Sequence, residues 1–153
     1  MDNRSRWILV AIALAAATSF AISVQSAWWT VGEVSIGPFG SRHCFGGECR
    51  ESGIAWIGGS DLWMRSAVAA RAAGYIVMFV FLMFAGAIAA KRTPVLVARG
   101  AAAALLTAAV TGSYFAAAFP GVNGASVSRG LFEFAAGLIF GVAALVLFLR
   151  RRP

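Results

Sequence analysis

Two cysteines and the only histidine of the chain lie close together in the sequence. Cys44 and Cys49 flank the segment Phe-Gly-Gly-Glu, and His43 directly precedes the first cysteine. Gly46 and Gly47 indicate a tight turn, which would place the two cysteines opposite each other across a hairpin. In an oxidising compartment such a pair forms a disulfide, and we expect that outcome first.

Two other kinds of chemistry remain open for these residues. The two thiols and His43 would make an incomplete zinc site. A nucleophile pair of Cys44 and His43 ranks below the metal site, because adjacent residues on a strand point to opposite faces. The spacing also differs from the C-x-x-C of thiol oxidoreductases. The sequence has no Walker-type loop, GxSxG, HExxH or paired histidines, so we expect no enzyme activity, cofactor or metal.

Arg71 and Glu133 are ionisable residues within long apolar runs. A charge there costs roughly 2.5–3.5 kcal/mol on insertion scales, so it needs a partner or a function. Both would lie at similar depth below one membrane face, and we expect them to pair across two helices. Arg129, four residues before Glu133, offers an alternative pair on one helix. A proton or ion relay is the functional alternative, but it needs further ionisable groups, which the inner halves of these runs lack.

The composition indicates what must position these residues. Of the 153 residues, 60% are apolar and 12% are charged, whereas soluble domains carry about 25% charged residues. The net charge of +7 comes from basic residues that lie largely at the ends of apolar runs. It therefore indicates membrane orientation, not nucleic-acid binding. We predict a single integral membrane domain over residues 1–153.

Four apolar runs are long enough to cross a bilayer as helices, which takes about 20 residues each. The predicted spans are 7–24, 66–90, 95–119 and 130–149, with an external loop at 25–65. Eight basic residues lie on one side of this arrangement: Arg4, Arg6, Lys91, Arg92, Arg99, Arg150, Arg151 and Arg152. We expect that side, with both termini, to be cytoplasmic in a plasma membrane or bacterial inner membrane.

The first run has an alternative interpretation. Residues 1–26 have a basic start and small residues near Ser23 and Ser26, as a cleaved signal peptide has. The apolar stretch is longer than the usual core of a signal peptide, so we expect a retained helix.

Small residues recur at four-residue spacing in the predicted helices, where they let helix backbones approach closely. The positions are Ala11, Ala15, Ser19 and Ser23 in the first helix, Gly100, Ala104, Ala108 and Gly112 in the third, and Gly137 and Gly141 in the fourth. We expect packing within one bundle, with a dimer contact through the fourth helix as the alternative.

The external loop holds most of the tryptophans. Residues 28–36 and 50–57 have the β-branched and aromatic composition of strands, so we expect a small antiparallel sheet around the cysteine turn. An interaction surface is predicted at the loop residues Trp28, Trp29, Phe39, Trp56 and Trp63. The predicted fold is an all-α membrane protein, in which a four-helix transmembrane bundle carries a small extracellular antiparallel sheet.

This pattern resembles the claudin and peripheral myelin protein superfamily of four-span proteins. The resemblance rests on Trp28-Trp29 after the first helix, Gly37-Pro38-Phe39 before the first of two cysteines, and Arg71 early in the second helix. Gly-Pro-Phe replaces the family's Gly-Leu-Trp, the cysteines are closer together, and the second loop at 121–128 is short. The resemblance implies a left-handed bundle topped by a sheet, with Arg71 in a structural role where the loop meets the helix.

Three functions follow as hypotheses. The first is a non-enzymatic membrane protein whose disulfide-pinned loop binds another copy of itself or another membrane protein. The second is an accessory subunit of a larger membrane complex, held through small-residue helix faces. The third is a small transporter or pore. The expected partners are the lipid bilayer and either a second copy or another membrane protein.

The charge distribution yields a test of topology. A cysteine introduced at Asn123 should react with a membrane-impermeant maleimide added outside intact cells, whereas a cysteine at the C-terminus should react only after permeabilisation. The unmodified chain serves as the control for background labelling. External labelling of the C-terminal cysteine would contradict the predicted orientation.

Overall fold

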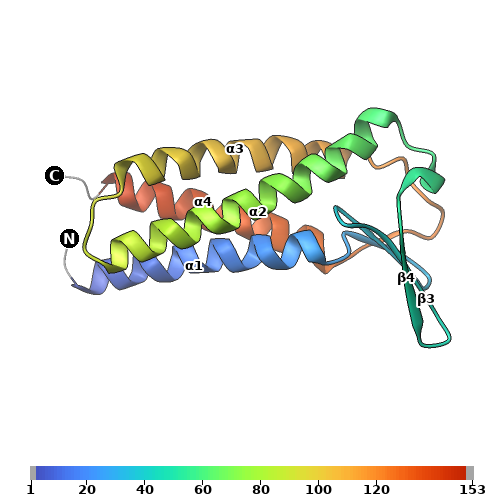
Figure 1. Ribbon diagram of the computed structural model, residues 1–153, viewed down its shortest axis with the longest axis horizontal. Helices are drawn as coiled ribbons and strands as arrows, with labels where there is room; N and C mark the ends of the chain where they lie inside the picture. Colours follow the sequence, from blue (N-terminus) through green and yellow to red (C-terminus); the bar gives the residue numbers. More distant parts are fainter. Residues whose placement is uncertain (1–2, 151–153) are drawn as a thin grey trace.

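Four long helices form a bundle with a small sheet at one end in the computed structural model, which describes residues 3–150 (Figure 1). The helices are α1 (Asn3–Gln25), α2 (Asp61–Ala89), α3 (Val95–Ala117) and α4 (Arg129–Arg150). All four are long and apolar enough to cross a membrane, which confirms the prediction of four long apolar helices. Arg151 and Arg152, two of the eight basic residues expected on the cytoplasmic side, lie outside the described residues. Both chain ends emerge at the end of the bundle opposite the sheet.

Helix α2 begins five residues before its predicted start at residue 66. The Ser60 side chain accepts a hydrogen bond of 3.2 Å from the backbone N–H of Trp63, and Asp61 places a negative charge in the first turn. Both features stabilise a helix N-terminus. As a result α2 has 29 residues, against 22 or 23 in the other three helices. It extends past them toward the sheet.

Helix order around the bundle follows from the packing. α1 packs along both α2 and α4, and α2 also packs along α3, whereas α2 and α4 share no extended contact. The core between the helices is built from small and aromatic residues, including Ala13, Phe20, Phe81 and Ala108, all of which are fully buried. Small residues on α1 therefore allow two neighbours to approach it at once.

Three of the four predicted packing glycines lie at close helix contacts. A Cβ atom on Gly137 would come within 2.9 Å of the Phe20 ring, and one on Gly141 within 2.9 Å of Leu105. Gly112 lies directly against the ring of Phe134. These helices can approach as closely as they do only because the side chain is missing.

The prediction for Gly100 is wrong. A Cβ atom there would meet nothing within 4 Å, because Gly100 lies on the exposed side of α3. The buried face of α3 instead runs through Ala101, Ala108 and Gly112. Gly74 on α2, which the spacing argument missed, lies directly against Val24 of α1.

The sheet has five antiparallel strands in the order β4-β3-β2-β1-β5. The strands are β1 (Trp29–Val31), β2 (Val34–Gly37), β3 (Gly40–Phe45), β4 (Glu48–Ser52) and β5 (Ser126–Val127). The expected strand at 28–36 is in fact two strands, because Gly32 has a φ of +56° and makes a two-residue turn. The expected strand at 50–57 ends at Ser52 and is followed by the short 3₁₀ helix η1 (Ala55–Ile57).

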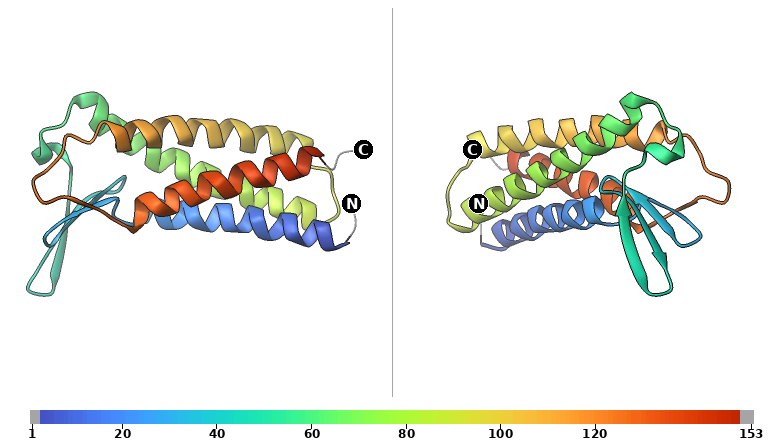
Figure 2. Two further views of the ribbon diagram at one scale, coloured as in Figure 1. Left: turned by 180° about the vertical axis from the view of Figure 1, so that it is seen from behind. Right: turned by 45° about the vertical axis from the view of Figure 1, so that its right-hand side comes forward.

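The second loop contributes the fifth strand. Ser126 and Val127 pair with Thr30 and Trp29 of β1, and the hydroxyls of Thr30 and Ser126 lie 2.9 Å apart. The first and second loops are therefore parts of one sheet, which lies across the end of the bundle with its β3–β4 hairpin projecting sideways (Figure 2).

The packing glycines yield a paired test. Gly137→Ala should lower the midpoint of thermal unfolding in detergent, because overpacking of a tight core typically costs about 1–3 kcal/mol. Gly100→Ala is the matched control and should leave the midpoint unchanged or raise it, since Ala favours helix and open space surrounds that position. Equal effects of the two substitutions would contradict the packing described.

Candidate functional site

The predicted disulfide is confirmed between Cys44 and Cys49. The two residues are directly paired across β3 and β4, with their Cα atoms 4.1 Å apart. Gly46 and Gly47 have φ values of +60° and +88°, as a type I′ hairpin turn requires. Neither sulfur is free as a metal ligand or a nucleophile. Within residues 3–150, no three His, Cys, Asp or Glu side chains are grouped so that they could hold a metal ion.

A buried serine connects the sheet to the 3₁₀ helix. The Ser41 hydroxyl donates a hydrogen bond of 2.9 Å to the Gly53 carbonyl and accepts one of 3.0 Å from the Trp56 indole N–H. The His43 ring lies beside Trp56, with 5.4 Å between ring centroids. Ser41 is completely buried, so this hydroxyl acts in packing and is closed to a substrate. It fixes where Trp56 stands on the surface.

Three of the five predicted interaction residues are buried, which corrects the sequence-based prediction. Trp28, Trp29 and Trp63 have at most 6% of their surface exposed. They lie between the sheet and the bundle, where they contact aromatic residues near the adjoining ends of α3 and α4. Trp29 stacks on Phe119 at 4.2 Å between centroids, and Trp28 lies 4.9 Å from Phe134. Trp28 and Trp29 attach the sheet to the bundle and Trp63 joins α2 to α3, so none of the three can contact a partner.

Two indole N–H groups in this aromatic layer cap the C-terminal ends of helices. Trp28 donates to the carbonyl of Ser23 at 3.0 Å, and Trp63 donates to the carbonyl of Phe115 at 3.0 Å. Both acceptors lie in the last turn of their helices, α1 and α3, where carbonyls have no partner within the helix. Each contact therefore satisfies a buried donor and an unpaired helix carbonyl together.

The end of α1 and the start of α4 are joined in the same region. The backbone N–H of Gly130 donates to Ala27, and the Ser23 hydroxyl donates to the carbonyl of Gly130 at 2.9 Å. A Cβ atom on Gly130 would come within 2.6 Å of the Ser26 carbonyl oxygen. Glycine is thus required here for the two chain segments to meet, a role that the sequence pattern did not indicate.

The exposed part of the predicted surface is the side of the sheet that includes the β3–β4 hairpin and η1. Phe45 at the hairpin tip is 63% exposed, and Trp56 is 48% exposed. Phe39 is half-buried, with the Arg42 guanidinium 5.4 Å above its ring. β4 is the outer strand on this side, and all five of its residues are exposed. It carries Glu51, which pairs with Arg42 at 2.8 Å.

The expected ion pair between Arg71 and Glu133 is not formed. Glu133 pairs instead with Arg129 at 3.2 Å, one helical turn away. The physical reason is the helix order, because α2 and α4 are not neighbours along their length. Among residues 3–150, Arg71 has no ion-pair partner, and it lines a cavity below the sheet.

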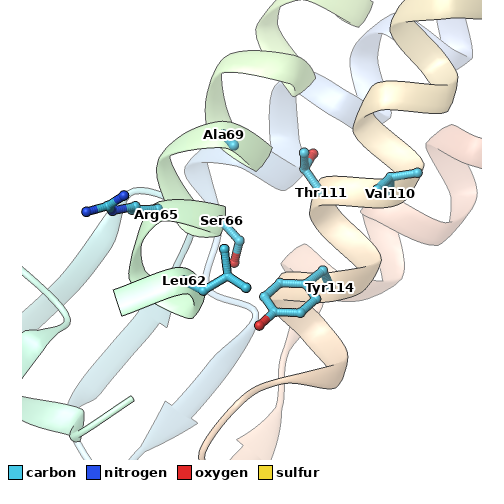
Figure 3. Close-up of a pocket in the computed structure, with 7 residues that line it drawn as sticks. All are labelled: Leu62, Arg65, Ser66, Ala69, Val110, Thr111 and Tyr114. Carbon is cyan, nitrogen blue, oxygen red and sulfur yellow. The ribbon is translucent and has the colours of Figure 1, made fainter. Parts of the chain in front are cut away.

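A groove of about 290 Å³ runs between the sheet-side ends of α2 and α3 (Figure 3). Leu62, Ser66 and Ala69 line it from α2, and Val110, Thr111 and Tyr114 from α3. Arg65 also borders the groove, but its guanidinium points away from α3. The lining is almost wholly apolar.

The Trp63 indole bond yields a test of how the sheet-side ends of α2 and α3 are joined. Trp63→Phe keeps a ring in the core but leaves the Phe115 carbonyl unsatisfied, and a buried unsatisfied group costs about 1–3 kcal/mol. We expect a lower thermal unfolding midpoint in detergent. Trp7→Phe is the control, since Trp7 is exposed and should tolerate the change. Equal midpoints for both variants would show that the hydrogen bond contributes nothing.

Comparison with known proteins adds no relative. No protein-family model, curated protein or solved structure gives a significant match to this chain.

Proposed function

We propose that this chain is a non-enzymatic four-span membrane protein whose disulfide-pinned sheet binds a second copy of itself or another membrane protein. The observation that carries the proposal is the exposed hairpin side of the sheet. There, Phe45 at the hairpin tip and Trp56 beside His43 are exposed, and β4 is the edge strand. Exposed aromatic residues beside a free strand edge are typical of protein-binding surfaces.

Rigidity supports the same proposal. The Cys44–Cys49 bond closes the hairpin, and Ser41 holds Trp56 against β3. A surface that is already ordered before it binds loses less conformational entropy on association. The buried Trp28 and Trp29 attach the sheet firmly to the bundle. The binding surface therefore keeps a fixed orientation relative to the membrane.

Charge on the edge strand supports selective binding. Glu48, Arg50 and Glu51 lie on β4, and charged side chains on an edge strand discourage pairing with arbitrary strands. A partner strand or loop with complementary charges would be accepted, whereas one with like charges opposite would be rejected. The proposal includes kinship with the claudin and peripheral myelin protein superfamily, on the loop residues and Arg71 described above.

The test removes the two exposed aromatic residues together. The wild-type protein, purified from native membranes in mild detergent, should elute as an oligomer or with a membrane-protein partner, identified by light scattering and mass spectrometry. Phe45→Ser with Trp56→Ser should elute as a monomer without a partner, because exposed aromatic anchors commonly contribute about 2 kcal/mol or more each.

Val127→Ser is the matched control, since Val127 is an exposed apolar residue on the opposite edge of the same sheet. This variant should retain the partner. Retention of the complex by the double variant would contradict the proposal and would favour an accessory subunit held through its helices. A wild-type protein that is monomeric at every concentration would also contradict it.

A further inference from the structure

A cavity of about 350 Å³ lies between α2 and the underside of the sheet. Met64, Val68 and Arg71 line it from α2, and Phe39, Gly53 and Ile54 line it from the sheet and the segment that follows. Most of the wall is apolar, and the cavity contains one charged side chain. It is separate from the exposed hairpin proposed above as a binding surface.

Arg71 is a positive charge without a compensating partner. Among residues 3–150 no carboxylate pairs with it, and no acidic side chain lines the cavity. Glu51 pairs with Arg42, and Glu133 pairs with Arg129. A charged group on a membrane helix is costly unless it meets an opposite charge or water. The cavity therefore favours an anion.

The position of Arg71 along α2 identifies the source of that anion. A bilayer core about 30 Å thick takes about 20 helical residues. Counted back from Ala89 at the opposite end, that length reaches Ala70. Arg71 thus lies at the sheet-side boundary of the hydrocarbon, from which its long side chain can reach the phospholipid phosphates just outside that boundary.

The helix surface below Arg71 suits acyl chains. Tyr75 and Phe79 follow at four and eight residues, on the same face of α2. Phe79 is largely exposed, as is Ile76 beside it. A lipid with its phosphate at Arg71 would place its chains along this apolar strip.

We propose that the cavity binds the headgroup of an anionic phospholipid from the sheet-side leaflet, with the phosphate paired to Arg71 and the chains along Tyr75 and Phe79. The planar guanidinium matches a phosphate with two parallel hydrogen bonds. The cavity provides no carboxylate for a choline group, and the Phe39 ring is occupied by Arg42. It therefore selects a headgroup with no cation of its own.

The test is native mass spectrometry of the detergent-purified protein titrated with phosphatidylglycerol, with phosphatidylcholine in a parallel series. The wild type should bind one phosphatidylglycerol more tightly than the rest and more tightly than phosphatidylcholine. Arg71→Gln should weaken that first binding about tenfold or more, as expected for a lost charge-assisted contact. Val68→Trp fills the cavity but keeps the charge, and it should also remove the first site.

Arg65→Gln is the matched control, because it removes an equal charge from the same helix outside the cavity. This variant should bind its first phosphatidylglycerol with the same affinity as the wild type. Equal losses in Arg65→Gln and Arg71→Gln would show general charge attraction and would overturn the proposal. Unchanged phosphatidylglycerol binding by Val68→Trp would also overturn the proposal. If Arg71→Gln proves unstable, the result with Val68→Trp decides whether the proposal stands.

Discussion

Two hydrogen bonds, from the indoles of Trp28 and Trp63 to the carbonyls of Ser23 and Phe115, hold together the end of the bundle that carries the sheet. Each helix ends below the sheet, where water is excluded and a carbonyl without a partner would be costly. An indole provides one donor and a large apolar ring in a single side chain, so it can end a helix and fill the surrounding space at once. Trp28, which directly precedes β1, thereby holds the sheet on the end of α1, whereas Trp63 joins the start of α2 to the end of α3.

The membrane region follows a different rule. Between the helices, lipid removes most of the hydrophobic drive, so close packing depends on small residues such as Gly112 and Gly137 against the rings of Phe134 and Phe20. Helix α4 takes part both in the contacts at the helix ends and in the small-residue packing between helices. Its first residues contact the end of α1 through Gly130 and Ser23, and Phe134 then contacts both Phe20 and Trp28. The Phe134 ring therefore belongs both to the aromatic layer below the sheet and to the core of the bundle.

The four long apolar helices and the disulfide could be predicted because their signals are local. About twenty consecutive apolar residues predict a long apolar helix, and two cysteines around Gly46 and Gly47 predict a disulfide, without knowledge of the rest of the fold. The errors came from properties that depend on distant segments. Nothing near Trp28 or Trp63 in the sequence indicates that Phe115 and Phe134 will cover them. The pairing of Arg71 with Glu133 required α2 and α4 to be neighbours, and helix order is not encoded in hydropathy. The two residues of β5 are too few to produce a strand signal, and Gly100 shares its spacing with Gly112 but not its side of the helix.

The distribution of the aromatic layer along the chain has a consequence for biosynthesis. Residues 40–52 contain everything that the Cys44–Cys49 hairpin needs, so this bond can close as soon as the first loop reaches an oxidising compartment. The three buried tryptophans, in contrast, must wait for Phe115, Phe119 and Phe134, which are synthesised much later. During that interval the indoles rest at the membrane–water interface, where tryptophan is favoured. The second half of the chain then covers them, so a nascent chain that stalls after α2 carries a complete hairpin on a loop whose tryptophans are still uncovered.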